Sequence, residues 1–328
     1  MATFVFTCGD INGIGPEIAY KSFMRIAPLN HDKYIFIAPL KVVNRLQLLH
    51  GAIEYQLLKN HSEPLKKKLS IIDIGNISAE PGNPTKQSGE IAFRAIETSF
   101  ALLKNGLADA VITAPISKTA INLAGINFPG HTEMYAEWCG VKNFVMTFLS
   151  KKMKAALQTI HIPLKDVAKK ITQKKLTETL TVLNSMLQND FGIKIPTIGV
   201  LGINPHAGEE GIIGKEEIEI IEPVIEKIKN KINVSGPFSP DAFFANGMEK
   251  NFNLVLGMYH DQVLIPFKQM NFGMGVNFTA GLPIVRTSPD HGTAFDIAWQ
   301  GIADESSMLE ALRYAKLIAN NRIKKNAN

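Results

Sequence analysis

The sequence predicts an α/β protein built from two lobes. Short β-rich runs alternate with longer helical patterns along all 328 residues, which is typical of this fold class. The composition is that of a globular protein, with 45% hydrophobic and 20% charged residues, and the length allows one large core or two smaller ones. Because no linker or compositional break interrupts the alternation, the sequence marks the border between the lobes only weakly.

Individual elements follow from the same patterns. Apolar residues at helical spacing predict a helix from about Ser88 to Asn105, which stops at Gly106, and an amphipathic helix from about Ser306 to Lys325. Further helices are expected after Pro16, Leu164, Gln173 and Gly214. Eight runs are expected to be strands: Thr3–Thr7, Tyr34–Ile37, Ser70–Ile74, Ala110–Thr113, Phe144–Phe148, Ala155–Ile160, Thr197–Leu201 and Asn253–Leu256.

Composition also narrows the class of partner. The net charge is +5, but the lysines are scattered in short runs without interleaved aromatic residues, so we expect no nucleic-acid partner. The positive excess favours small anionic substrates. Cys8 and Cys139 lie far apart in sequence, and no signal peptide or membrane-spanning run is visible. We therefore expect a soluble, cytoplasmic protein with no membrane contact.

The first candidate motif runs from Gly9 to Glu17, between the first predicted strand and the first predicted helix. Its glycines permit a tight turn, Pro16 suits the first helical position, and the backbone amides beside Gly13 and Gly15 can hold an anion. It lacks the G-x-G-x-x-G fingerprint, because Ile18 fills the third glycine position. On its own, the motif is about as compatible with a purely structural turn.

Two further segments lie where α/β proteins place ligands. Residues 113–118 directly follow a predicted strand, and Gly130 to Glu133 open a predicted helix. A hydroxyl from Thr132 beside the imidazole of His131 is suited to phosphate or carboxylate. The alternative is that Thr132 caps the helix while Glu133 interacts with its dipole.

Three histidines occur at or just after the ends of apolar strands: His161, His206 and His260. Strand-end residues of one parallel sheet can converge on a point, and three neutral imidazoles form a good ligand set for a divalent transition metal. Asp261 is placed to orient one ligand. Each histidine alone is more typical of a core or surface residue, and sequence spacing does not prove convergence.

Candidate anion binders follow His260. Arginine has a planar fork that suits phosphate or carboxylate, and lysine can also transfer a proton if its pKa falls on burial. The candidates are Lys268, Asn277 and Arg286, each of which could equally be a surface residue. A loop that enters a helix comes next, from Asp290 to Ala298, in which Gly292 allows close backbone approach and Thr293 is available as a cap.

Taken together, these motifs resemble the 4-hydroxythreonine-4-phosphate dehydrogenase family of pyridoxal phosphate biosynthesis. The resemblance spans most of the chain, and the combination is far more specific than any single motif. It is carried by Gly9-Asp10, by Gly130-His131-Thr132-Glu133, by residues 204–209 (Asn-Pro-His-Ala-Gly-Glu), by Tyr259-His260-Asp261-Gln262 and by residues 287–298.

The resemblance implies a fold similar to that of isocitrate and isopropylmalate dehydrogenases, with two α/β/α lobes and no Rossmann fingerprint. It implies a homodimer with active sites at the subunit interface, NAD or NADP as cofactor, and one divalent ion per subunit, which is zinc, magnesium or cobalt. One lobe would comprise residues 1–125 and 275–328, with the termini and cofactor loop, and the other residues 126–274, with the metal and substrate residues.

Site residues follow from the same resemblance. Metal ligands would be His161, His206 and His260, substrate binders would be His131, Thr132, Lys268, Asn277 and Arg286, and the cofactor loop would comprise His291, Gly292, Thr293 and Ala294. From their own chemistry, Gly13 and Gly15 are further candidates for cofactor binding, and Lys268 and Asp261 are candidates for catalytic roles. The chain departs from the family pattern at three places. Ile11-Asn12 stands where Pro-Ala is common, Glu210 where glycine is common, and Trp299-Gln300 where Gly-Lys is common.

The expected reaction is oxidation of 4-phosphohydroxy-L-threonine at C3, followed by decarboxylation to 3-amino-2-oxopropyl phosphate. A paralogous dehydrogenase of a threonate or erythronate phosphate is the closest alternative, because it would share these motifs. A phosphate acyltransferase is another, since such enzymes have a related fold, but they need neither the three histidines nor NAD. A non-catalytic phosphate-binding protein is the remaining alternative.

Overall fold

The computed structural model describes residues 2–26, 31–128, 130–271 and 273–326. They divide into two compact units, each of which is described by itself. Unit 1 comprises Met1–Gly140 and Pro283–Ala319, and unit 2 comprises Val141–Leu282 and Asn320–Asn328. These borders differ from the predicted lobes, 1–125 with 275–328 and 126–274. One consequence is that His131 and Thr132 belong to the same unit as Arg286.

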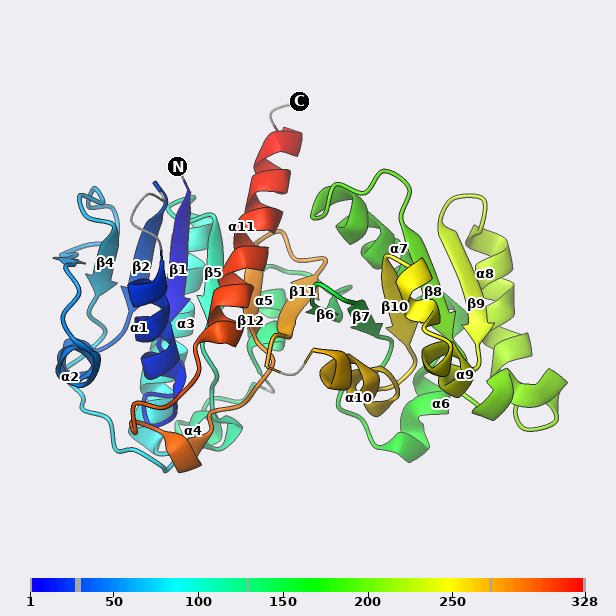
Figure 1. Ribbon diagram of the computed structural model, residues 1–328, viewed down its shortest axis with the longest axis horizontal. Coiled ribbons are helices and arrows are strands. Elements are labelled where there is room, and N and C mark those ends of the chain that lie inside the picture. Colours follow the sequence, from blue (N-terminus) through cyan, green and yellow to red (C-terminus); the bar gives the residue numbers. More distant parts are fainter. Residues whose placement is uncertain (1, 27–30, 129, 272, 327–328) are drawn as a thin grey trace. The chain divides into compact units, whose positions relative to one another are not determined.

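The sheet of unit 1 is parallel throughout the strands described (Figure 1). Its order is β3-β4-β2-β1-β5-β12. Buried apolar residues on the central strands explain why both faces need cover. The strands are β1 (Thr3–Thr7), β2 (Lys33–Ile37), β3 (Gln56–Leu57), β4 (Leu69–Ile72), β5 (Ala110–Thr113) and β12 (Arg286–Pro289).

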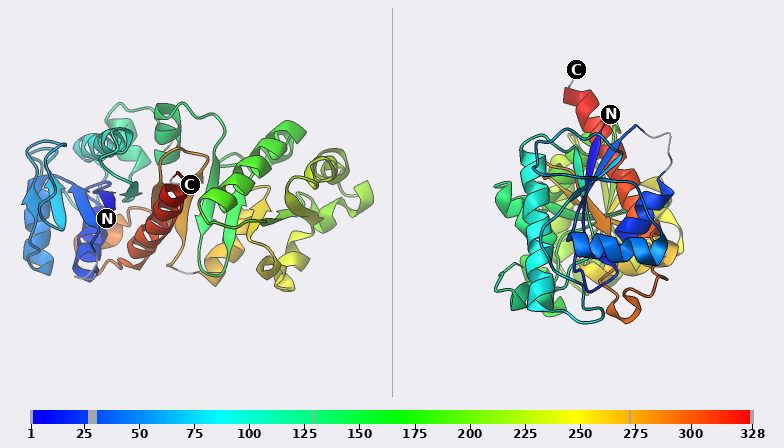
Figure 2. Two further views of the ribbon diagram at one scale, coloured as in Figure 1. Left: turned by 90° about the horizontal axis from the view of Figure 1, so that it is seen from above. Right: turned by 90° about the vertical axis from the view of Figure 1, so that its left-hand side faces the viewer.

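Helices cover both faces of this sheet, with α3 on one side and α1 and α11 on the other (Figure 2). Helix α3 begins with a reciprocal capping box between Thr85 and Ser88. The helices are α1 (Gly15–Arg25), α2 (Leu40–His50), α3 (Lys86–Lys104), α4 (Lys118–Leu123), α5 (His131–Trp138) and α11 (Ser306–Asn326), and the short 3-10 helix η5 covers Phe295–Ile297.

Unit 2 has a mixed sheet in the order β11-β6-β7-β10-β8-β9. Strand β6 is antiparallel to both β11 and β7, while β7, β10, β8 and β9 run parallel. The parallel part therefore has one edge where all the carboxyl ends meet. The strands are β6 (Val145–Leu149), β7 (Lys154–Leu157), β8 (Thr197–Leu201), β9 (Asn233–Phe238), β10 (Leu254–Gly257) and β11 (Val276–Ala280).

In unit 2, α7 and α8 lie on one face of the sheet and α9 and α10 on the other (Figure 2). Under α10, Val263 and Phe267 pack with Leu157 and Leu201 in one buried cluster, which fixes α10 against the strand ends. The helices are η1 (Leu164–Asp166), α6 (Val167–Lys170), α7 (Gln173–Asn189), η2 (Pro205–Gly211), the π-helical turn η3 (Glu217–Ile221), α8 (Glu222–Ile228), α9 (Pro240–Ala245), η4 (Met248–Asn251) and α10 (His260–Met270).

The predicted α/β class with helices on both faces is confirmed for each unit. All eight predicted strands are present, and those at Thr3–Thr7, Ala110–Thr113 and Thr197–Leu201 have the predicted bounds. The expected run Ala155–Ile160 ends early, at Leu157, because the chain turns toward His161. Sequence patterns missed β3, β9, β11 and β12; β12, for example, is the short polar stretch Arg-Thr-Ser-Pro, which lacks the expected apolar composition.

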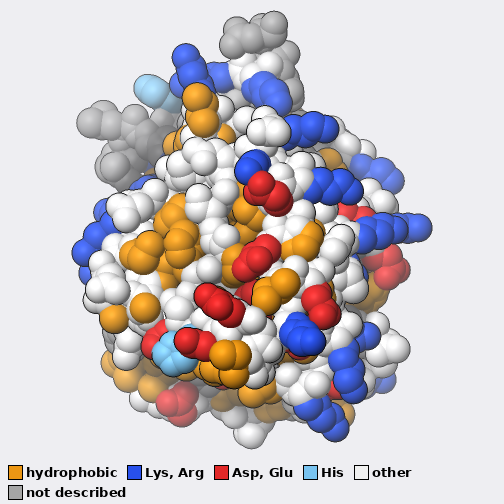
Figure 3. Space-filling model, turned by 90° about the vertical axis from the view of Figure 1, so that its right-hand side faces the viewer, with side chains coloured by type: hydrophobic (Ala, Val, Ile, Leu, Met, Phe, Trp, Pro, Cys, Tyr) orange, Lys and Arg blue, Asp and Glu red, His pale blue; other side chains and the backbone are white. Residues whose placement is uncertain are grey.

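None of the described helices is both long and apolar enough to cross a membrane. On the face of unit 2 near α8 and β9, acidic and apolar side chains occupy the middle, while lysine and arginine lie mostly toward the rim (Figure 3). The basic excess of the chain is thus not concentrated on this face.

Candidate functional site

Three parallel strands of unit 2 end beside the histidines expected to bind metal. Strand β10 pairs with β7 on one side and with β8 on the other, so the three carboxyl ends are neighbours at one edge. His161, His206 and His260 follow the ends of β7, β8 and β10 within a few residues. The expectation that these strand ends share one parallel sheet is confirmed.

His161 and His260 lie together. Their ring centroids are 5.8 Å apart, and both line a cavity of about 350 Å³ whose wall includes Thr159, Tyr259 and Asp261. His260 is the first residue of α10, and its Nδ1 lies 2.6 Å from Oδ1 of Asp261. This contact engages Nδ1 and leaves Nε2 as the nitrogen available to a ligand.

His206 lies in an unusual turn. Residues 206–210 all have positive φ, with values of 51° at His206, 51° at Ala207, 86° at Gly208, 46° at Glu209 and 53° at Glu210. Left-handed backbone costs a residue other than glycine roughly 1–2 kcal/mol, so the four such residues in this five-residue turn need strong support from their surroundings. The resemblance leads one to expect glycine at position 210, and the φ of 53° at Glu210 is a backbone conformation that glycine adopts most readily.

The structure brings two of the three histidines together. Among the residues that it describes, no three His, Cys, Asp or Glu side chains are placed to hold one metal ion, so His206 does not complete the pair within one chain. The pair itself fits a metal: two adjacent imidazoles, one oriented by a carboxylate, are ligands that borderline divalent ions prefer.

Side-chain hydrogen bonds tie the three strand ends to one another. Gln262 donates from Nε2 to the carbonyl of Gly202 at 2.6 Å, and its Oε1 accepts from the amide of Met258 at 2.6 Å. The hydroxyl of Thr159 donates to the carbonyl of Met258 at 2.6 Å. Neither Gln262 nor Thr159 was identified from the sequence, although Gln262 is the last residue of the motif that contains His260.

In unit 1, Arg286 is a buried cation without a carboxylate partner. It is 3% exposed, and its Nε and Nη2 donate to the hydroxyl of Thr113 at 3.0 and 2.8 Å. No described residue forms an ion pair with it, and burial lowers its pKa to about 10. An arginine in this setting is suited to an anionic ligand, because burying a charge without a counter-charge is costly.

His131 contributes to the same environment. It is 9% exposed, its Nε2 has no hydrogen-bond partner, and burial together with the charge of Arg286 holds its pKa well below the ordinary value of 6.5. The ring is therefore neutral at pH 7. Thr132 is also buried, but the N-cap position of α5 is Gly130, so the alternative that Thr132 caps the helix is wrong.

Lys268 and Asn277 belong to unit 2. Lys268 is exposed near the end of α10, the helix that begins at His260. Asn277 lies on β11, and its Oδ1 is buried without a partner. Within unit 2, α10 thus carries His260, Asp261 and Lys268, while a strand presents Asn277.

The two segments expected to bind the cofactor lie against each other in unit 1. The amide of Ile14 donates to the carbonyl of Thr293 at 2.9 Å. A Cβ on Gly13 would lie 2.7 Å from that carbonyl oxygen, and one on Gly15 would lie 2.5 Å from the carbonyl oxygen of Cys8. Both glycines are therefore required by packing at the start of α1.

The loop from His291 to Ala294 differs in detail from its prediction. His291 Nδ1 lies 3.0 Å from the carbonyl oxygen of Gly292, and Ala294 has a φ of 41°. Ala294 precedes η5 without a side-chain cap, so Thr293 does not act as the cap that its position suggested. Apart from its chain neighbours, no described residue has an atom within 4 Å of a Cβ built on Gly292, so packing does not require that glycine.

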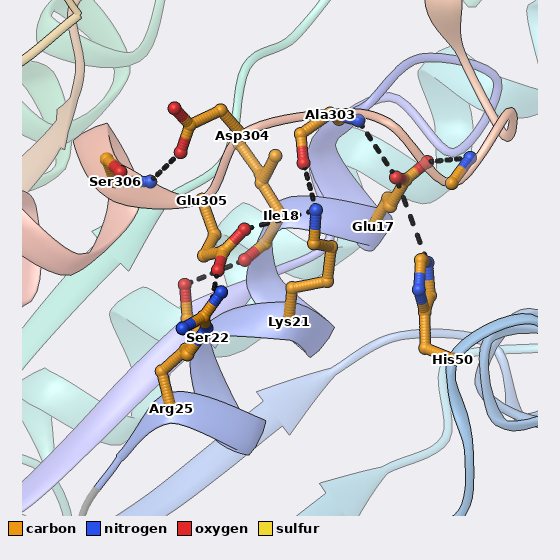
Figure 4. Close-up of polar contacts among 11 residues, drawn as sticks. Glu17, Ile18, Lys21, Ser22, Arg25, His50, Ala303, Asp304, Glu305 and Ser306 are labelled. Atoms are coloured by element: carbon orange, nitrogen blue, oxygen red, sulfur yellow. Dashed lines mark hydrogen bonds and ion pairs between the residues drawn. The ribbon is translucent and has the colours of Figure 1, made fainter.

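A buried carboxylate that sequence patterns did not identify anchors the segment after this loop. Glu17 of α1 is fully buried and accepts from the amides of Ala303 and Gly301 at 3.1 and 3.4 Å (Figure 4). Beside it, Glu305 pairs with Lys21 at 3.1 Å and with Arg25 at 3.0 Å. These contacts attach residues 301–305 to the helix that follows the glycine loop.

Comparison with known proteins identifies the family. Residues 30–315 match the model of the family described as pyridoxal phosphate biosynthetic protein PdxA. The chain belongs to the PdxA family. It is 45% identical to the 4-hydroxythreonine-4-phosphate dehydrogenase of Desulforapulum autotrophicum, covering 95% of this chain and 94% of that protein. The corresponding enzyme of Prosthecochloris aestuarii is 40% identical, with 98% and 99% covered.

A solved structure supports the same assignment. The crystal structure of 4-hydroxythreonine-4-phosphate dehydrogenase from Klebsiella pneumoniae matches with a TM-score of 0.84 and 36% identity, covering 97% of this chain and all of that one. The family resemblance expected from the motifs is therefore confirmed, and this PdxA-family chain is an oxidoreductase of pyridoxal phosphate biosynthesis.

Proposed function

We propose that this chain oxidises 4-phosphohydroxy-L-threonine at C3 with NAD, and that the product decarboxylates to 3-amino-2-oxopropyl phosphate. The reaction would supply a precursor of pyridoxal 5'-phosphate. The observation that carries the proposal is the buried, unpaired charge of Arg286 beside the neutral imidazole of His131, in a chain whose relatives are named for this substrate.

Anion binding is the first role of these residues. The substrate has a phosphate and a carboxylate, either of which an arginine can bind. The two hydrogen bonds from Arg286 to Thr113 fix the orientation of the guanidinium before a ligand binds. Because His131 is neutral, its Nε2–H or lone pair binds by hydrogen bonding without adding charge. Thr132 completes this set in unit 1, and Lys268 and Asn277 are the proposed substrate binders of unit 2.

His161, His206 and His260 are the proposed metal ligands, for one zinc, magnesium or cobalt ion per subunit. When bound, such an ion stabilises negative charge on the substrate oxygen and on the enolate that follows decarboxylation. Asp261 fixes the orientation of His260 through the 2.6 Å contact at Nδ1. Lys268 is the proposed proton-transfer group.

We propose that a second copy of the chain completes the site. The support is that His161 and His260 of one chain lie together while His206 does not join them among the described residues. A homodimer with active sites at its interface accounts for this separation. Copper or iron would suit imidazoles as well, so the donor set alone does not select the ion.

The cofactor is assigned to the facing loops of unit 1, with Gly13 and Gly15 on one and His291, Gly292, Thr293 and Ala294 on the other. The open space around Gly292 and the amides at the start of α1 support this assignment. NAD is proposed as the cofactor, with NADP as the variant to test. A cytoplasmic setting is proposed because Cys8 and Cys139 are both free thiols.

The deciding experiment incubates purified, metal-loaded protein with 4-phosphohydroxy-L-threonine and NAD and follows NADH by absorbance. We expect NADH formation, with loss on chelation and recovery when Zn²⁺, Co²⁺ or Mg²⁺ is restored. Threonate 4-phosphate and erythronate 4-phosphate serve as competing substrates. Faster turnover of either would transfer the proposal to a paralogous activity, and absence of NADH with all three would remove it.

A further inference from the structure

The feature that carries a further inference is a buried carboxylate behind the left-handed turn of His206. Glu217, the first residue of the π-helical turn η3, has no exposed surface. Its Oε1 accepts from the backbone amides of Ile203 at 2.7 Å and Asn204 at 2.8 Å. Its Oε2 accepts from Nδ2 of Asn204 at 2.8 Å. One side chain therefore binds the two residues that lead into Pro205 and His206 at three points.

The packing around Glu217 shows that the turn is built on this side chain. A Cβ on Gly208 would lie 2.8 Å from Oε2 of Glu217, and one on Gly202 would lie 3.1 Å from Oε1. A Cβ on Gly214 would lie 2.2 Å from Nδ2 of Asn204. Three glycines thus leave only enough room for the carboxylate and its partner amide.

The geometry of η3 explains how a glutamate reaches this position. A π-helical turn contains one extra residue, which changes the direction of the side chains that follow, and such turns occur frequently at functional sites. Here the turn begins at Glu217 and continues directly into α8. Glu219 lies on the same turn but is exposed. Among the described residues, no hydrogen bond joins its side chain to residues 203–210.

We infer that Glu217 is a positioning residue for His206: by binding the amides that precede the left-handed turn, it holds the imidazole where it ligates metal. This inference rests on the proposed function, because it takes His206 as a ligand. It goes further by assigning a role to a residue that does not touch metal, substrate or cofactor. Residues that orient metal ligands typically change affinity or activity by about 10–100-fold when mutated.

The test compares metal binding by purified full-length wild type, H206A, E217Q and E219Q. E217Q keeps the size of the side chain but replaces one carboxylate oxygen by an NH₂ group, which donates and cannot accept. The variant therefore loses either the two hydrogen bonds from the backbone amides of Ile203 and Asn204 or the one from Asn204 Nδ2. E219Q makes the same change of charge on the exposed side of the same turn. The measurements are the Kd for Co²⁺ by competition titration, the Co²⁺ ligand-field absorption spectrum, and the melting temperature.

We expect E217Q to bind Co²⁺ about tenfold or more weakly than wild type and to change the ligand-field spectrum, while E219Q matches wild type in both. A spectral change in folded protein reports ligand geometry, which a loss of stability alone does not alter. The amides of Ile203 and Asn204 should also exchange hydrogen faster in E217Q.

The outcomes separate this inference from the proposed function. If H206A binds Co²⁺ as wild type does, His206 is not a ligand, and both the metal set and this inference fall. If H206A loses Co²⁺ while E217Q keeps wild-type affinity and spectrum, the ligand set stands and only the role of Glu217 is overturned. Should E217Q not fold, N204A is judged by the same criteria: it removes the side-chain hydrogen bonds of Asn204 to Glu217 and Glu216 and keeps the two backbone amides that donate to Glu217 Oε1.

Discussion

Gln262 connects the strand end that leads to His206 with the one that leads to His260. Its side-chain amide donates to the carbonyl of Gly202 and accepts from the amide of Met258, each at 2.6 Å. Because Gln262 is 9% exposed, both backbone groups depend on it rather than on water. Just beyond the ladder that pairs β8 with β10, one side chain on α10 therefore holds the two strand ends together.

Replacing Gln262 by alanine should lower stability and weaken metal binding together. Two buried backbone groups lose their partners, which costs about 1–3 kcal/mol each at most, and the strand ends become free to shift. Urea unfolding and Co²⁺ titration measure the two effects. Q269A, at an exposed position of the same helix, is the control. Metal affinity in Q262A equal to that in Q269A would show that the connection does not matter to the site.

The sequence predicted the class and most strands, because these depend on local patterns, and the order of its motifs pointed to candidate site residues. It did not predict what supports them. Thr113 meets Arg286 across 173 positions and Glu217 meets Asn204 across 13, and no periodicity relates such partners. The short polar strand β12 was missed for a similar reason, since it is specified by its pairing with β5 rather than by its own composition.

The hydroxyl of Thr113 should prove important for substrate binding. T113V keeps the shape of the side chain but removes the acceptor that holds Arg286 at two nitrogens, so the guanidinium can rotate within its pocket. We expect KM for 4-phosphohydroxy-L-threonine to rise by about tenfold, the equivalent of one such charged hydrogen bond. Steady-state kinetics at fixed NAD give the value.

T113S is the matched control for T113V, because it retains the hydroxyl and loses only a methyl group. It should restore KM to within a few-fold of wild type. Equal KM values in T113V and wild type would mean that Arg286 is held by its backbone and packing alone, and that Thr113 has no part in orienting it.

Stability should fall in mildly acidic solution because of His131. Its folded-state pKa lies well below 6.5, owing to burial and then to the charge of Arg286, so below pH 6.5 the unfolded chain binds a proton that the folded chain does not. Stability is therefore complete above this pH and declines as the pH falls, by at most about 1.4 kcal/mol per pH unit for one group.

Urea unfolding at pH 7.5, 6.5 and 5.5 checks this prediction by comparing wild type with H131Q. His50 also has a pKa lowered by burial and contributes with the same sign in both proteins, so the difference between them isolates His131. Wild type should lose more stability than H131Q over this interval. Parallel curves would show that His131 titrates normally in the folded protein.

The two cofactor loops offer a paired test at Gly13 and Gly292. In G13A, the new Cβ would lie 2.7 Å from the carbonyl oxygen of Thr293, so the loops must separate, and overpacking of this kind costs about 1–3 kcal/mol. In G292A, the new Cβ meets no atom of the described residues within 4 Å apart from its chain neighbours, so stability should be unchanged. If NAD lies against this loop, however, the added methyl group occupies its space.

We therefore expect G13A to lower both the melting temperature and the affinity for NAD. G292A should lower the affinity for NAD alone. Thermal unfolding measures the first quantity and KM for NAD the second. A G292A protein with wild-type KM for NAD would place the cofactor away from this loop, whatever G13A shows.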